Sequence, residues 1–122
     1  MSGFDDIRSI VPRRIWDGIT ARGVHGERLT LAVVELEPGA VAELHSHDHE
    51  QLGMVLRGSI FFRIRDEERD LRPGETWQIP SNTPHRAVAG PDGATVLDVF
   101  APPRSEWQEA AEAGEAGPGR WP

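Results

Sequence analysis

Short apolar stretches alternate with glycine- and proline-containing turns along most of this 122-residue chain. The stretches are rich in Val, Ile, Leu and Phe, and their length and composition are typical of β-strands. Turn residues such as Pro-Gly and Arg-Gly stand between them. We predict eight strands: Arg14–Ile19, Leu29–Leu36, Val41–His47, Gln51–Leu56, Ser59–Arg65, Thr76–Ile79, His85–Ala89 and Thr95–Phe100. Such a series favours an all-β fold, either a small barrel or a jelly-roll sandwich.

One segment near the C-terminus has a helical pattern instead. Ser105 is suited to the N-cap, Gln108 stands at the capping-box position, and Gly114 ends the pattern. We therefore predict a short C-terminal helix over Ser105–Ala113. The charged stretch Asp66–Asp70 is interpreted as the tip of a solvated hairpin.

The length of the chain suits one domain with a single apolar core. No internal repeat or linker divides it. We expect an N-terminal arm and strand over residues 1–28, the barrel core over 29–104, and the C-terminal helix and tail over 105–122.

Composition narrows the possible partners. The chain has 13 Lys and Arg, 20 Asp and Glu, and a formal net charge of −7. Without a basic surface we expect neither nucleic acid nor a membrane as partner. No signal pattern or run of about 20 apolar residues is present, which predicts a cytoplasmic protein acting on a small molecule. Cysteine is absent, so any metal would be bound by histidine and by oxygen ligands.

The stretch HSHDHEQ, residues 45–51, contains three of the five histidines. Alternate residues of a strand point to the same face, so His45 and His47 share a face with Gln51, whereas Glu50 does not. His85 follows a turn and could join them from a neighbouring strand. Taken alone, the cluster is typical of a solvated loop as well as of a metal site.

Two motifs resemble those of the cupin superfamily. The first, G-x5-H-x-H-x(3,4)-E-x6-G, is matched by Gly39, His45, His47, Gln51 and Gly58, with Gln51 in place of the glutamate. The second, G-x5-P-x-G-x2-H-x3-N, is matched by Gly74, Pro80 and His85, with Asn82 and Ala89 in place of the Gly and the Asn. The resemblance implies a single cupin β-barrel. It also implies one divalent metal ion held by His45, His47, Gln51 and His85.

The glutamine changes the expected chemistry. An amide oxygen is neutral and gives less support to a trivalent metal than a carboxylate does, so non-redox Lewis-acid chemistry is favoured. Glu50 would supply a carboxylate only if a bulge shifted the strand register. Zn, Ni, Mn, Fe and Co all accept such ligands, and the sequence does not distinguish them. We expect His49 to lie outside the ligand set and His25 to face solvent.

A third segment, LDVFAPPRSEW, contains one carboxylate within an apolar strand. Together with the first motif, it is similar to the small cupins of pectin degradation, which open 4,5-unsaturated uronates to 5-keto-4-deoxyuronate. That resemblance implies active-site roles for Asp98, Phe100 and Arg104. Asp98 would move protons, Arg104 would bind the substrate carboxylate, and Phe100 would form an apolar wall. The alternative is that Asp98 is a structural partner of Arg104.

Other interpretations stay open at this point. A fold and a metal do not fix a substrate, so a polyketide-cyclase-like cupin and a non-catalytic metabolite-binding cupin are alternatives. The tryptophans are spread along the chain, which favours packing over a sugar-stacking platform; either Trp77 or Gln78 could reach the cavity. Both faces of Leu31–Val34 and of Val96–Phe100 are apolar, which implies cover by a second sheet and the C-terminal helix or by a partner subunit, and we expect a homodimer.

Overall fold

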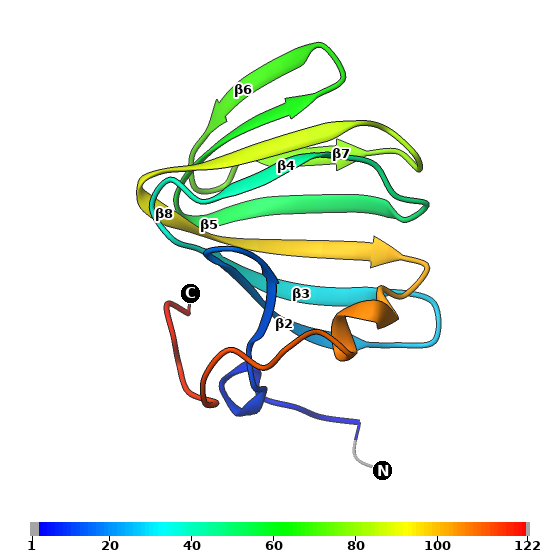
Figure 1. The fold of residues 1–122 in the computed structure, drawn as a ribbon. Helices are drawn as coiled ribbons and strands as arrows, with labels where there is room; N and C mark the ends of the chain where they lie inside the picture. Colours follow the sequence, from blue (N-terminus) through cyan, green and yellow to red (C-terminus); the bar gives the residue numbers. More distant parts are fainter. Residues whose placement is uncertain (1–2, 122) are drawn as a thin grey trace.

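The computed structural model describes residues 3–121, which form one eight-stranded sheet curled around a single apolar core (Figure 1). The elements, in chain order, are η1 (Ile7–Ser9), β1 (Arg13–Trp16), β2 (Ile19–His25), β3 (Thr30–Leu36), β4 (Val41–His45), β5 (Glu50–Ile64), β6 (Glu67–Leu71), β7 (Thr76–Ile79), β8 (His85–Ala101) and η2 (Ser105–Gln108). The predicted all-β class is confirmed. No helix among the described residues is long and apolar enough to cross a membrane.

Two long strands, β5 and β8, run antiparallel to each other through the whole sheet. Each was predicted as two strands separated by a turn, and that division is wrong. The strands continue because both bend together: the register shifts near Gly58, where a side chain would come within 2.0 Å of the Gly93 carbonyl oxygen. Gly58 and Gly93 also have positive φ angles of 76° and 75°, which glycine adopts without strain.

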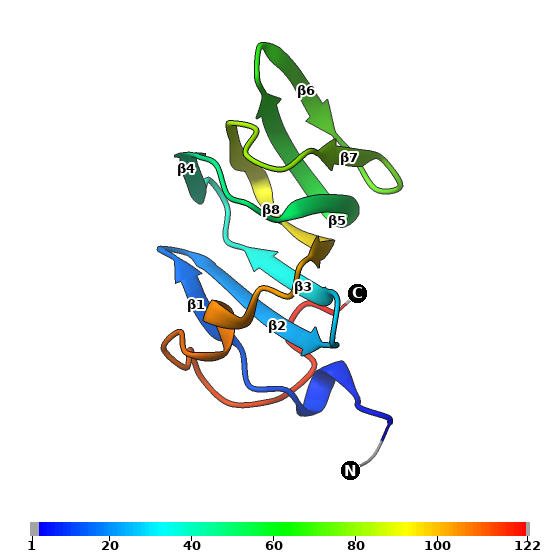
Figure 2. The ribbon, with the colours of Figure 1, turned by 90° about the vertical axis from the view of Figure 1, so that its right-hand side faces the viewer.

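The bend gives the sheet two halves that face each other across the core. In one half, the first part of β5 pairs with β7 and the second part of β8 pairs with β3, which continues through β2 to β1. In the other half, β6 pairs with the second part of β5 and β4 pairs with the first part of β8. Figure 2 shows β1, β2 and β3 together, with η2 lying against β1 and β2. The core side chains include Val55, Ile60, Ile79, Val96 and Phe100.

Two further strand predictions need correction. The predicted strand Arg14–Ile19 covers most of β1 and only the first residue of β2, because the chain turns at Asp17-Gly18, where Gly18 has a φ of 76°. The rest of β2, residues 20–25, was not predicted as a strand. The predicted hairpin tip over Asp66–Asp70 is largely strand β6. Four of the five β6 side chains are exposed and only Leu71 is buried, so this edge strand lacks the apolar pattern that would reveal it.

The predicted helix over Ser105–Ala113 is also wrong: only the 3-10 turn η2 forms. Arg104, not Ser105, is its N-cap residue, and no side chain caps it. The backbone beyond η2 bonds instead to the N-terminal segment, since the Arg14 N–H donates to the Ala111 carbonyl and the Ala113 N–H to the Pro12 carbonyl. Pairing with a distant segment has replaced the local helical bonds that the capping pattern favours.

Candidate metal centre

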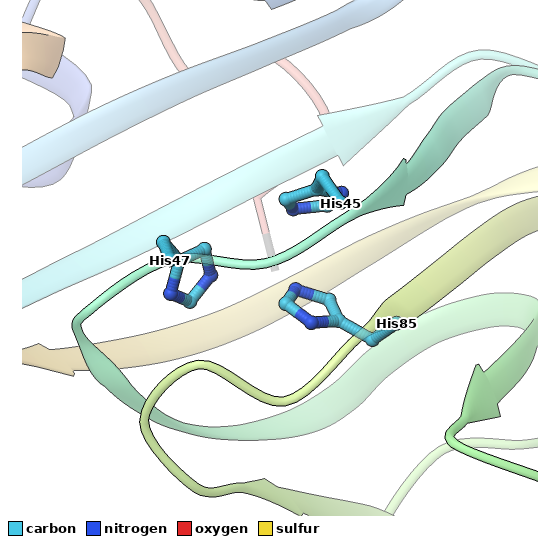
Figure 3. A group of neighbouring side chains, drawn as sticks. All are labelled: His45, His47 and His85. Carbon is cyan, nitrogen blue, oxygen red and sulfur yellow. The ribbon is translucent and has the colours of Figure 1, made fainter.

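Three histidines converge inside the barrel from separate elements (Figure 3). His45 is the last residue of β4, His47 follows in the loop, and His85 begins β8, where it is the register partner of His45. Their ligand atoms all lie within 4.8 Å of one another. The structure therefore brings together the three histidines that the motifs singled out.

Backbone carbonyls fix the tautomer of each imidazole. The Nδ1 atoms lie close to carbonyl oxygens: His45 to Glu43 at 2.6 Å, His47 to His49 at 3.0 Å and His85 to Thr83 at 2.8 Å. A carbonyl oxygen only accepts, so each Nδ1 carries the hydrogen and donates it. Each Nε2 then keeps its lone pair, which is how metal-binding histidines are oriented in proteins.

Asn82 explains one departure from the second motif. Its φ is 59°, a left-handed conformation that asparagine tolerates better than most side chains. Its N–H donates to the His47 carbonyl at 2.7 Å, which ties the turn before β8 to the loop that carries His47. Asparagine can thus replace the glycine of the motif while keeping the turn that delivers His85.

The protein keeps these imidazoles neutral. Burial lowers the pKa of His85 to about 4, although its hydrogen bond to Thr83 acts in the opposite direction. Burial also lowers the pKa values of His45 and His47, and the nearby Arg104 charge adds to the effect. Neutral imidazole is the form that binds a metal, so the electrostatics suit the donor atoms.

Gln51 lies beside the triad. Its side chain is 6% exposed, its Nε2 donates to Asp98 Oδ1 at 2.9 Å, and its Oε1 lies 3.1 Å from His47 Nε2. Since the His47 tautomer leaves a lone pair on Nε2, two acceptor atoms face each other there, an arrangement that a bound cation relieves. Glu50 is exposed on the other face of β5. Three imidazole nitrogens and one amide oxygen therefore fit a divalent first-row metal.

Asp98 is buried and its side chain is 6% exposed. Both of its hydrogen bonds reach Oδ1, one from Gln51 Nε2 and one from Trp77 Nε1 at 3.1 Å. Burial raises the pKa of Asp98 to about 6, while these two hydrogen bonds oppose the rise. The structural alternative from the sequence paired Asp98 with Arg104, yet within residues 3–121 Arg104 forms its ion pair with Glu106.

Arg104 is held against two aromatic rings. Its guanidinium carbon lies 4.8 Å from the Phe100 ring centroid and 4.5 Å from that of Trp107. Its Nε donates to Glu106 Oε1 at 3.1 Å, and its backbone N–H donates to Thr30 Oγ1. Burial lowers the Arg104 pKa, and Glu106 opposes the shift. Neither Nη atom donates a hydrogen bond to a described residue, so both are available to donate to an anion.

The prediction that either Trp77 or Gln78 reaches the cavity is confirmed for Trp77, but the convergence of Trp16 and Trp107 on the same cavity was not predicted. Trp16, Trp77 and Trp107 all line the same cavity as His45, Asp98 and Arg104. The Trp16 ring lies 5.2 Å from that of His45, and the Trp107 ring lies 5.0 Å from that of Phe100. Of the pair Trp77 and Gln78, Trp77 points inward and Gln78 is exposed. Spacing along the chain gave no signal for this convergence, because the sheet register creates it.

Of the two remaining histidines, His49 agrees with its prediction and His25 does not. His49 is outside the triad, as expected, and lies 3.7 Å from Glu106. His25 was expected to face solvent, but it is half-buried at the end of β2 and its Nδ1 lies 2.8 Å from Thr30 Oγ1. That hydroxyl also accepts the Arg104 N–H, so His25 supports the segment that carries Arg104.

Comparison with known proteins agrees with this geometry. Residues 32–100 match the family model of the cupin domain. The pectin degradation protein KdgF of Dickeya dadantii is 30% identical over 93 residues, which cover 75% of this chain and 84% of that protein. The structure of KdgF from Halomonas sp. superposes with a TM-score of 0.80 at 30% identity, covering 87% of this chain and 98% of that one.

A more distant similarity joins the chain to a larger enzyme. Oxalate decarboxylase OxdC of Bacillus subtilis is 35% identical over 79 residues, which cover 61% of this chain and only 20% of that enzyme. The matched family region spans β3 to β8 and contains the histidine triad together with Gln51 and Asp98. This chain therefore belongs to the cupin domain family.

Proposed function

We propose that this chain is a metal-dependent cupin enzyme that opens the ring of 4,5-unsaturated uronates to give 5-keto-4-deoxyuronate. The observation that carries the proposal is one cavity lined by Asp98 and Arg104 together with His45 and His85, two members of the histidine triad. The similarity to two KdgF proteins, one of them named for pectin degradation, supports the substrate class.

The ligand set we propose is His45, His47, His85 and the Gln51 amide oxygen. A divalent metal bound there would supply Lewis acidity toward the oxygens of the substrate. The neutral amide favours non-redox chemistry, because it supports a trivalent metal less than a carboxylate would. The reaction is then an isomerisation without electron transfer.

Arg104 would bind the substrate carboxylate. Its Nε is occupied by Glu106, while Phe100 and Trp107 hold the plane of the guanidinium. The two Nη atoms can then donate together to both oxygens of a carboxylate, which is the strong bidentate geometry. Phe100 contributes an apolar wall beside the same site. We expect Arg104 to fix the position of the substrate relative to Asp98.

Asp98 would move the proton. Ring opening breaks the bond between C1 and the ring oxygen, releases the C1 hydroxyl proton, and requires a new proton at C4, so the atoms balance without another reactant. Asp98 Oδ1 already accepts two hydrogen bonds, whereas Oδ2 accepts none within residues 3–121. A pKa raised by burial to about 6 suits a group that accepts and returns a proton near neutral pH.

The conjugated C4=C5 bond of the substrate absorbs in the near ultraviolet, which gives a direct assay. We expect metal-loaded protein to remove this absorbance and a chelator to stop the reaction. Asp98→Asn should lower kcat by about 10²- to 10⁴-fold with unchanged metal content, the usual contribution of acid–base catalysis. Glu50→Gln, which changes the same charge on the outer face, is the matched control and should remain active.

Two results would contradict the proposal. A fully active Asp98→Asn variant would exclude the acid–base role. No loss of absorbance with fully metal-loaded protein would exclude the uronate reaction, and would favour a polyketide-cyclase-like or metabolite-binding cupin instead.

We also propose that a second copy of this chain covers the outer face of the sheet. Val24, Leu31, Val99 and Leu52 are register partners on four neighbouring strands, and they form an apolar row across that face. Three of them are well exposed, with Leu52 at 48%. No charged residue interrupts the row, so the same row of a like copy is its chemical match.

A further inference from the structure

A glycine separates two functional side chains on the inner face of the sheet. Gly53 of β5 is the register partner of Trp77 on β7 and of Asp98 on β8. A Cβ atom at Gly53 would lie 2.1 Å from Cε2 and 2.2 Å from Nε1 of Trp77. The missing side chain therefore lets the indole lie across β5. The indole N–H reaches Asp98 two strands away.

The hydrogen bonds at Asp98 fix how the Gln51 amide is oriented. Asp98 Oδ1 accepts from Trp77 Nε1 and also from Gln51 Nε2. With its NH₂ group committed to Asp98, the Gln51 amide must turn its oxygen toward His47. The reverse orientation would point the NH₂ group at the triad, where its hydrogens would repel a cation.

We propose that Trp77, Gly53 and Asp98 act as positioning residues that hold the Gln51 amide oxygen toward the metal. The inference rests on the proposed metal site. It also explains why residue 51 is a glutamine: a glutamate there would place a second carboxylate at the position that now donates to Asp98 Oδ1 at 2.9 Å. Position 51 must donate to Asp98 and accept toward the metal, and an amide does both.

A double-mutant cycle of Trp77 and Asp98, measured by metal affinity, tests whether these residues hold the Gln51 amide in its orientation. In Trp77→Phe the carboxylate still accepts from Gln51, and in Asp98→Asn the indole N–H still holds the new amide oxygen in place. When both changes are combined, the two amides can reverse together. We expect the double variant to bind Zn²⁺ at least tenfold more weakly than the product of the single effects predicts, in the range found for groups that orient metal ligands.

The affinities should be measured by competition with a chromophoric chelator at pH 8, and with Co²⁺ to record the visible spectrum. Reversal of the Gln51 amide removes an oxygen ligand, so the Co²⁺ spectrum should change only in the double variant. The matched control is the cycle of Trp77→Phe with Glu50→Gln, which removes a charge from the outer face and should give a purely multiplicative effect. A multiplicative result within about twofold for Trp77 with Asp98 would overturn the proposal.

His85→Ala separates this inference from the metal site itself. If the native protein binds Zn²⁺ and His85→Ala does not, the proposed metal site is supported. The double-mutant cycle alone then tests whether Trp77 and Asp98 position the Gln51 amide. If His85→Ala binds as tightly as the native protein, both proposals fail.

A second arm uses thermal stability and remains decisive if the double variant does not fold. Gln51→Glu should lower the melting temperature of the metal-free protein at pH 8, and adding Asp98→Asn should restore it. Stability of Gln51→Glu equal to that of the native protein would refute the pairing.

Discussion

Replacing Gly53 by alanine is the sharpest test of the packing beneath the metal centre. The added Cβ would lie 2.1 Å, 2.2 Å and 2.3 Å from Cε2, Nε1 and Cζ2 of Trp77. Carbon atoms in contact are about 3.5–4.0 Å apart, so the indole must move by about 1.5 Å. Its hydrogen bond to Asp98, 3.1 Å long, cannot survive that displacement.

Two contributions of Gly53→Ala lower the free energy of unfolding, and one raises it. Overpacking a core position costs about 1–3 kcal/mol, and losing a hydrogen bond to a charged group costs about 1.5–3 kcal/mol. Alanine restricts the unfolded chain more than glycine does and returns about 0.5–1 kcal/mol in a strand. Gly53→Ala should therefore lower the free energy of unfolding by about 1.5–5.5 kcal/mol.

Urea denaturation measures this change in the free energy of unfolding. Circular dichroism is the suitable probe because its signal does not depend on the fluorescence of the displaced Trp77. Trp77→Phe already lacks the N–H, so Gly53→Ala made in that background should cost at least about 1.5 kcal/mol less, and the difference is a coupling energy. Equal costs of Gly53→Ala in the two backgrounds would refute the argument, since they would show that the alanine does not act through Trp77.

Three further results are expected. Zn²⁺ at about 100 times its dissociation constant should stabilise the native protein by about 2.7 kcal/mol, and His85→Ala should lose this stabilisation in thermal unfolding. Arg104→Lys keeps the charge but loses the planar fork and the stacking on Phe100, so KM for the uronate should rise by about tenfold or more with a smaller change in kcat in steady-state assays. Leu52→Lys places a charge in the apolar row and should shift the protein from dimer to monomer in sedimentation velocity, whereas a native protein that sediments as a monomer would contradict the proposed interface.

Sequence patterns predicted several of the strands that have a buried apolar face, although most of β2 was missed. The strands Leu29–Leu36 and Thr76–Ile79 agree with the structure to within one residue at their ends, because their inward side chains are apolar. The edge strand β6 was missed because its side chains are mostly exposed and charged. The helix over Ser105–Ala113 failed for a different reason: its backbone found partners in the N-terminal segment, and no local pattern contains that information.

In the candidate site, too, some residues were predictable from the sequence and others depend on how distant segments pair. His45, His47 and Gln51 are close in sequence, and parity together with the motif spacing singled them out, although His47 lies in the loop between β4 and β5 and Gln51 lies on β5. The position of Trp77 over Gly53 depends on the register between β5 and β7, which neither segment determines alone. The hydrogen bond between Gln51 and Asp98 joins residues 47 positions apart, so local sequence patterns could not predict it either.

That hydrogen bond changes how the glutamine is interpreted. Considered alone, Gln51 is a weaker, neutral replacement for a carboxylate ligand. Beside Asp98 it is the residue that would let a buried carboxylate lie next to the proposed metal site, because its NH₂ group donates to Asp98 while its oxygen faces His47. A glutamate would serve the metal but would repel Asp98, and an apolar residue would leave both unsatisfied. The proposed acid–base group and the proposed metal ligand are therefore specified together, and a change at either position should be judged by its effect on the other.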